Sequence, residues 1–485
     1  MNGNIWWSFP MVRIFSGLLG GVGLALALGG TLTPAIAQAR PCGATPCLLL
    51  AQSAGITADS VDELVFQGNE YYDQGQYELA LAAYDAALIL NANDAELWIW
   101  RGIALGALER YEEELASYDQ AIALDTDQNN HIVWYNRGVA FGKLGRYEEE
   151  IASYDQALAR DPRYVNAWYN RGIALGELGH YEEEIASYDQ ALALDPEDVG
   201  AWYNRGIALG KLGRYEEEIA SYDQALALNP EDADIWYNRG IALGELNRYE
   251  EEIASYDQAL ALNPEDADAW FNQSLAFEEL ERYEEALVGY EQVLVLDPED
   301  ADAWYNQGVI FGKLDRHEAA IGSYDQAIAL NPGDIDAWNN RGVSLEGLGR
   351  YEEAIASYEQ ALTIDPNYAY IWNNHGVALG EIEQYEEELN SYNQALTIDP
   401  SHEDALFNKG LALADLDRHE EAILSYDALL ALNPNDAEAW NNHGISLEAL
   451  GRYAEAIASY DQALAIDPDY EDALINRESA QTALE

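Results

Sequence analysis

The chain has 485 residues, and 88 acidic against 24 basic side chains give it a formal net charge of −64 at pH 7. This excess repels phosphate backbones and no basic cluster offsets it, so we expect no nucleic-acid partner. The same charge keeps an exposed protein dispersed in water and steers basic partners toward it.

The first 37 residues have the pattern of a bacterial-type signal peptide. Arg13 is their only basic side chain, residues 14–30 form an apolar run, and residues 35–37 are an Ala-Ile-Ala cleavage site. A start at Met11 would give a shorter signal of the same kind. An uncleaved anchor is the alternative, although the run of 17 residues is shorter than the about 20 that span a bilayer. We expect cleavage, export to the periplasm or the medium, and no stable membrane span afterwards.

Residues 38–60 are expected to form a flexible linker. They contain Cys42 and Cys47, the two cysteines of the chain. In an oxidising compartment these residues can close a small disulfide loop, and two free thiols are the alternative.

The rest of the chain has a period of 34 residues, which predicts stacked repeats. Ten prolines keep this interval, namely Pro162, Pro196, Pro230, Pro264, Pro298, Pro332, Pro366, Pro400, Pro434 and Pro468. Tryptophan keeps the same interval at Trp134, Trp168, Trp202, Trp236, Trp270, Trp304, Trp338, Trp372 and Trp440. Leu406 fills the missing position, and Trp98 and Leu64 extend the series backward.

Residues 165–198 represent one repeat, which we expect to contain two amphipathic helices. The buried face of the first helix comprises Trp168, Gly172, Leu175 and either Leu178 or Gly179. After a break at Gly179, the second helix shares a face made of Ile185, Tyr188, Ala191 and Leu192, and Pro196 ends the repeat.

Small residues at Gly172 and Ala191 let the two helices approach closely as an antiparallel hairpin. A single hairpin cannot bury both of its faces, so each must stack on the next in an all-α solenoid. Residues 471–485 begin like another first helix, but Glu478 takes the place of the glycine and no second helix follows. We therefore expect a C-terminal capping helix.

Trp168, Gly172, Tyr188, Ala191 and Pro196 at these intervals resemble the tetratricopeptide repeat, TPR. The resemblance implies a right-handed α-solenoid whose concave groove binds proteins or peptides. The twelve units are expected at 61–94, 95–130, 131–164, 165–198, 199–232, 233–266, 267–300, 301–334, 335–368, 369–402, 403–436 and 437–470.

The repeats depart from the TPR pattern at Glu184, where the family usually has alanine. Glutamate occupies this position in six units, and arginine occupies the Arg171 position in five of those six but in only one of the others. This co-occurrence predicts an ion pair between Arg171 and Glu184, repeated along the first half. Recent duplication of a block is the alternative.

One side of each first helix remains for a partner, and it carries a row of asparagines beside aromatic residues. The candidate binding residues are Asn136, Tyr169, Asn170, Tyr203, Asn204, Tyr237, Asn238, Asn272, Asn306, Asn340, Asn374, Asn408 and Asn442. A primary amide both donates and accepts, so such a row can pair with the backbone of an extended peptide. The row resembles the asparagine ladder of O-linked N-acetylglucosamine transferases, without their catalytic domain. In the alternative, these amides only bond neighbouring helices.

These patterns predict an exported scaffold that binds protein or peptide partners. The alternative is a structural spacer of the cell envelope with an empty groove. We expect no enzyme, cofactor or metal site, because the seven histidines lie at variable positions without nearby ligand sets, and no phosphate-binding loop is present.

Overall fold

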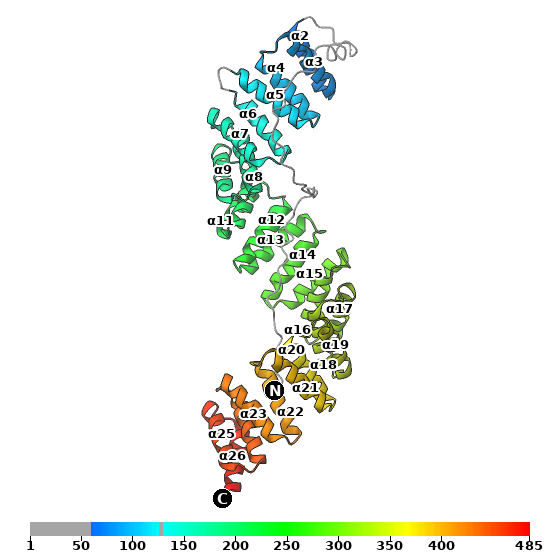
Figure 1. Ribbon diagram of the computed structural model, residues 1–485, viewed down its shortest axis with the longest axis vertical. Coiled ribbons are helices and arrows are strands. Elements are labelled where there is room, and N and C mark those ends of the chain that lie inside the picture. The colour runs from blue at the N-terminus through cyan, green and yellow to red at the C-terminus, as the bar shows by residue number, and fades with distance from the viewer. Residues whose placement is uncertain (1–59, 126–129) are drawn as a thin grey trace. The chain divides into compact units, whose positions relative to one another are not determined.

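The computed structural model describes residues 60–125 and 130–485, so the leader, the two cysteines and nearly all of the linker lie outside it. Within the described ranges the chain forms 25 α-helices and no strand, which confirms the all-α fold class (Figure 1). The chain divides after Arg160 into two compact units, one containing helices α2 to α7 and the other containing α8 to α26.

The helices alternate between a 13-residue A helix and a 14-residue B helix. The A helices are α2 (Val61–Asp73), α4 (Ala95–Ala107), α6 (His131–Lys143), α8 (Val165–Glu177), α10 (Val199–Lys211), α12 (Ala233–Glu245), α14 (Ala267–Glu279), α16 (Ala301–Lys313), α18 (Ile335–Gly347), α20 (Ala369–Glu381), α22 (Glu403–Asp415) and α24 (Ala437–Ala449). The B helices are α3 (Tyr77–Leu90), α5 (Tyr111–Leu124), α7 (Tyr147–Arg160), α9 (Tyr181–Leu194), α11 (Tyr215–Leu228), α13 (Tyr249–Leu262), α15 (Tyr283–Leu296), α17 (His317–Leu330), α19 (Tyr351–Ile364), α21 (Tyr385–Ile398), α23 (His419–Leu432) and α25 (Tyr453–Ile466). A last helix, α26 (Glu471–Leu484), follows α25.

Each A helix ends in a turn that requires a left-handed residue. In the α8–α9 turn, Gly179 has φ of 73°, and the His180 N–H donates to the Leu175 carbonyl at 2.9 Å. This is the Schellman arrangement, which satisfies the last carbonyls of a helix. Six turns use glycine in this position, whereas the other six use Glu109, Asn247, Glu281, Asp315, Glu383 and Asp417.

The periodic tryptophan and proline are joined by a hydrogen bond. Trp202 Nε1 donates to the carbonyl of Pro196 at 3.1 Å, and the same bond forms between Trp168 and Pro162 at 3.0 Å. Asp198 caps the A helix between them by accepting the Ala201 N–H at 3.0 Å. The shared period therefore fixes the entry of the chain into each A helix.

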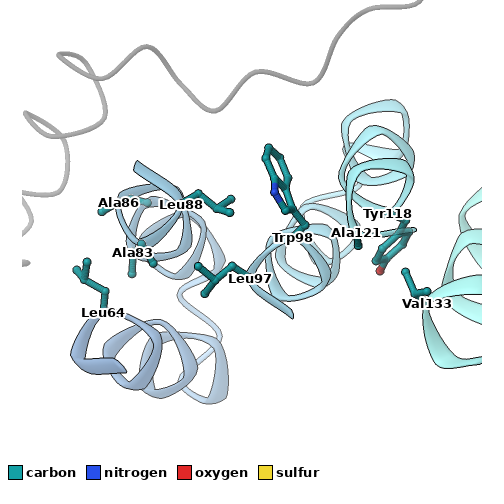
Figure 2. Close-up of a cluster of buried hydrophobic side chains, with 11 residues drawn as sticks. Leu64, Ala83, Ala86, Leu88, Leu97, Trp98, Tyr118, Ala121 and Val133 are labelled. Carbon is teal, nitrogen blue, oxygen red and sulfur yellow. The ribbon is translucent and has the colours of Figure 1, made fainter. Parts of the chain in front are cut away.

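The core contains one fully buried tyrosine per hairpin, from Tyr84 to Tyr460. Tyr188 Cε1 lies only 2.6 Å from where a Cβ on Gly172 would be, so the tyrosine ring occupies the space that the glycine leaves. This confirms the predicted close approach of the two helices. Figure 2 shows the core of the N-terminal unit, where Leu97 and Trp98 of α4 pack beside Leu88 of α3.

Helix α26 closes the C-terminal unit by packing against α25 and α24. Asn476 Nδ2 donates to Asn441 Oδ1 at 3.0 Å, and Ser479 Oγ donates to Glu448 Oε1 at 3.0 Å. Glu478 is exposed, as expected where no further B helix follows.

Candidate ligand-binding face

The predicted asparagine row lies on the A helices, and we call this side of the A helices the ladder face. In α8 it comprises Tyr169, Asn170, Ile173 and Gly176, which are half-buried or exposed. The ten candidate asparagines named above share one position of their A helices, on α6 to α24. The three candidate tyrosines occupy the preceding position of α8, α10 and α12. Whether they bind a partner stays a prediction.

The ladder amides bond across consecutive repeats. Asn204 Nδ2 donates to Tyr169 Oη at 3.1 Å, and the pairs Asn238–Tyr203 and Asn272–Tyr237 repeat this bond at 3.0 Å. Farther along, Asn340 donates to Tyr305, whereas Asn374 and Asn408 donate to the buried Asn339 and Asn373. Each of these amides therefore uses an N–H to hold two A helices together. The carbonyl oxygens of Asn204, Asn238 and Asn272 accept no hydrogen bond within the described residues, whereas that of Asn340 accepts one from Asn339 at 3.0 Å.

The ladder tyrosines rest on the core tyrosines of their own hairpins. The ring centroids of Tyr203 and Tyr222 are 6.0 Å apart, and those of Tyr237 and Tyr256 are 5.8 Å apart. This contact and the amide bond hold each ladder tyrosine from both sides, so its exposed edge is fixed before any ligand arrives.

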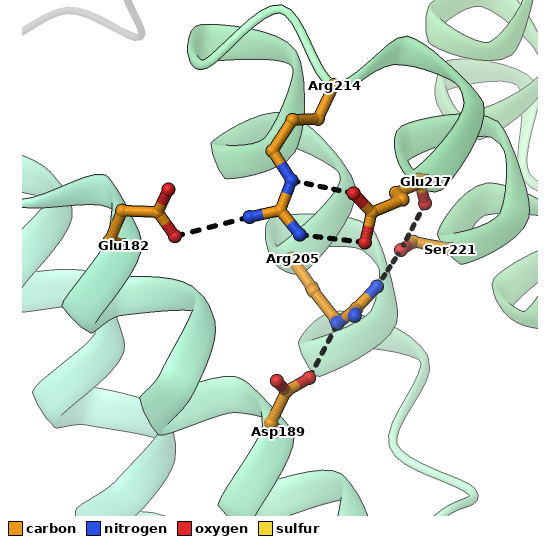
Figure 3. Close-up of polar contacts among 6 residues, drawn as sticks. All are labelled: Glu182, Asp189, Arg205, Arg214, Glu217 and Ser221. Atoms are coloured by element: carbon orange, nitrogen blue, oxygen red, sulfur yellow. Dashed lines mark hydrogen bonds and ion pairs between the residues drawn. The ribbon is translucent and has the colours of Figure 1, made fainter.

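The arginines of this region show that the predicted Arg171–Glu184 ion pair is wrong. Arg205 Nε donates to Asp189 Oδ1 at 2.7 Å, and its Nη1 donates to Ser221 Oγ at 2.6 Å (Figure 3). Arg171 Nη1 donates in the same way to Ser187 Oγ at 2.7 Å. Arg341 makes both contacts, with Asp325 and Ser357, in a repeat whose glutamate is replaced by Ala354. The arginine therefore does not depend on the glutamate.

The glutamate instead contacts the core tyrosine. Tyr222 donates to Glu218 Oε1 at 3.0 Å, and Glu218 fills the space beside Gly210 on the A helix. In other repeats the carboxylate comes from the A helix: Tyr358 donates to Glu346 Oε1 at 2.8 Å, and alanine takes the B-helix position. At Tyr426 neither helix supplies a carboxylate, and the hydroxyl has no hydrogen-bond partner among the described residues.

Burial perturbs the titration of these carboxylates. Burial raises the pKa of Glu218 from 4.5 to about 7, although the hydrogen bond from Tyr222 acts in the opposite direction. Burial raises the pKa values of Glu184, Glu278 and Glu346 to about 7 as well. Sequence reasoning missed this set, although a signal was present: glutamate on one helix always faces glycine or alanine on the other.

In the N-terminal unit the ladder face contains a cavity of about 390 Å³. It is lined by Ile103, Glu114, Tyr118, Asn136 and Lys143, among others. A ladder asparagine and a buried carboxylate thus share one cavity, with a lysine beside them.

Family models for tetratricopeptide repeats match most of the repeat region. One matches residues 117–164, 135–199, 169–233, 203–261, 237–295, 373–437 and 422–471. Others match residues 68–109, 95–128, 301–334 and 335–368. The chain belongs to the tetratricopeptide repeat family. TPR chains act as scaffolds for contact with proteins or peptides.

Solved structures resemble parts of this TPR chain. YrrB, described as a TPR protein with an unusual peptide-binding site, is 30% identical over 39% of this chain and 97% of its own, with a TM-score of 0.36. MamA from Desulfovibrio magneticus RS-1 is 23% identical over 35% of this chain and 96% of its own, with a TM-score of 0.34. Yeast Tom70 is 15% identical over 87% of this chain and 95% of its own, with a TM-score of 0.35. No curated protein matches the chain.

The described residues contain no candidate membrane span and no candidate metal site. Across 60–125 and 130–485, no helix is long and apolar enough to cross a membrane. No group of three or more His, Cys, Asp or Glu side chains in the same ranges could hold a metal ion.

Proposed function

We propose that this TPR chain is an exported scaffold that holds an extended segment of a partner protein on its ladder face. The observation that carries the proposal is the row of half-buried asparagines and tyrosines whose cross-repeat bonds use the amide N–H groups and not the amide oxygens of Asn204, Asn238 and Asn272. Extended backbone presents N–H groups at regular intervals, so a rigid row of acceptors suits it. Export is proposed from the leader sequence of residues 1–37.

A structural spacer is the second candidate, and one observation favours it. The same amides already join neighbouring A helices, so their presence is explained without a ligand. The two candidate functions predict different peptide binding in two kinds of variant: one that removes the amides, and one that removes only the bonds between repeats.

Two triple variants separate them. Changing Asn204, Asn238 and Asn272 to Ala removes the amides, whereas changing their three partner tyrosines to Phe removes the same bonds between repeats and keeps the amides. Peptides selected by display on the wild-type protein serve as probes, and circular dichroism checks the fold. A ladder-face scaffold loses binding in the Asn variant and keeps most of it in the Tyr variant. Equal binding by all three proteins would favour the spacer.

Export has its own test. N-terminal sequencing of the mature protein from a bacterial host is expected to begin at Gln38, after the predicted cleavage site. Recovery of the intact leader in the membrane fraction would favour the uncleaved anchor.

A further inference from the structure

Glu218 places a carboxylate in a site that glycine opens on the ladder face. Its Oε2 lies 2.6 Å from where a Cβ on Gly210 would be, and Gly210 follows Tyr203 and Ile207 along the same side of α10. Glu218 is 7% exposed, and its Oε2 has no hydrogen-bond partner within the described part of the chain. An ionised oxygen that is buried without a hydrogen-bond donor costs free energy, so a donor supplied by a partner would stabilise Glu218.

The groups around Glu218 do not supply that donor. Tyr222 of α11 already bonds Oε1, and Glu245 of α12 adds a second negative charge, which raises the pKa of Glu218. Tyr215 of α11 is hydrogen-bonded to Glu245. Lys211 of α10 is the one nearby cation that lowers the pKa of Glu218, and its side chain is exposed. Around Glu218, the negative charge of Glu245 is therefore opposed by the positive charge of the exposed Lys211 alone.

Another repeat shows which group completes such a site. There Lys313, the last residue of α16, places its Nζ 3.9 Å from Oε2 of the buried Glu278. Glu245 occupies the same final position in α12. Lys313 thus lies beside the buried carboxylate of Glu278, whereas Glu245 takes the equivalent position in the helix that follows Glu218.

The cavity beside Glu114 shows that such a site has room for a side chain. Glu114 is the equivalent of Glu218, and the cavity that it lines measures about 390 Å³. There Lys143 lines the cavity from the end of α6, at the position that Glu245 has in α12.

We infer that Glu218 and Glu245 form a pocket for the ammonium group of lysine, or the guanidinium group of arginine, from the segment that lies on the ladder face. This inference rests on the proposed function and names the chemistry of its partner. The net charge of −64 draws such a basic segment toward the chain before the pocket selects its side chain. Glu346 and Glu381 show a similar combination of charges, since Tyr358 bonds Glu346 and Glu381 adds the second charge.

The test uses the full mature chain and a fluorescent peptide of alternating lysine and alanine, with an acetyl-lysine version as the neutral probe. Binding is measured by fluorescence anisotropy at about pH 8 and physiological salt. Glu218→Gln is compared with Glu216→Gln, which removes an exposed charge from the same turn of α11. We expect Glu218→Gln to weaken lysine-peptide binding about tenfold, and Glu216→Gln to stay within about twofold, because only the first removes a charge-assisted hydrogen bond.

Equal losses in the two variants, or none in either, would overturn the pocket, because attraction to the general negative charge would then explain all of the binding. Tight binding of the acetyl-lysine probe would overturn it as well. If peptides selected on the wild type bind through the asparagines but contain no lysine or arginine, the pocket fails while the scaffold function stands. If display selects no peptide at all, the scaffold function itself fails.

Discussion

Replacing Glu218 by glutamine tests the energetic cost of the buried carboxylate. Its pKa rises from 4.5 to about 7 on folding, chiefly through burial. Each pKa unit corresponds to about 1.4 kcal/mol, so ionising Glu218 in the folded state costs about 3 kcal/mol. Because the folded state holds the proton more tightly than the unfolded state, this cost is absent below about pH 4, grows between 4.5 and 7, and is complete above 7.

Local opening of α10 and α11, measured by hydrogen exchange of their backbone amides, reports this cost in a repeat protein. With glutamine standing in for the protonated carboxyl group, exchange in Glu218→Gln is expected to be about a hundredfold slower than in wild type at about pH 8. The two proteins are expected to exchange alike at about pH 4. Glu216→Gln is the matched control and should show no such change. A gap that is equal at both pH values, or larger at low pH, would refute the reasoning.

Three further results are expected. Gly172→Ala should lower the free energy of unfolding by about 1 to 3 kcal/mol, because its methyl group would collide with the core tyrosine ring. Gly322→Ala has open space beside it and should raise the free energy of unfolding by about 1 kcal/mol. Urea titration of both variants checks that the two changes have opposite signs. Glu281→Gly should stabilise its left-handed turn by about 0.5 to 1 kcal/mol, and Gly179→Ala should destabilise the equivalent turn, as thermal melting will show. The lysine peptide should bind the wild type more weakly at about pH 6 than at about pH 8, because Glu218 gains a proton, and Glu218→Gln should remove this difference in an anisotropy titration.

The fold could be predicted because its determinants repeat. Trp168, Gly172 and Pro162 recur at one interval, and each has a local physical role: the indole bonds the proline carbonyl, and the glycine makes room for a ring. When residues with the same structural role recur at a fixed spacing, the recurrence makes that role visible in the sequence. Helix order and the capping helix followed from this.

The arginine contact could not be predicted in the same way. The partners of Arg205 are Asp189 and Ser221, residue types that stay nearly constant from repeat to repeat, so they leave no pattern of joint variation. The glutamate did vary together with arginine, but it contacts tyrosine. Joint variation among repeats therefore did not indicate contact here.

The ladder was only partly predictable. The row of asparagines is visible in the sequence, but the bonded amides reach a tyrosine or an asparagine 35 residues earlier, one residue away from the repeat period. Comparing equivalent positions therefore does not reveal the pair. Only the three-dimensional stacking of A helices brings Asn204 to Tyr169.

The central claim is that a partner segment lies on the ladder face, and site-directed photocrosslinking tests it most directly. A benzophenone amino acid is placed at Ile173, which is exposed on the ladder face of α8, and in a second protein at Gln190, which is exposed on α9 of the same repeat. A selected peptide is expected to crosslink to the Ile173 position and not to the Gln190 position. Crosslinking at Gln190 alone, or at neither position despite measurable binding, would contradict the account.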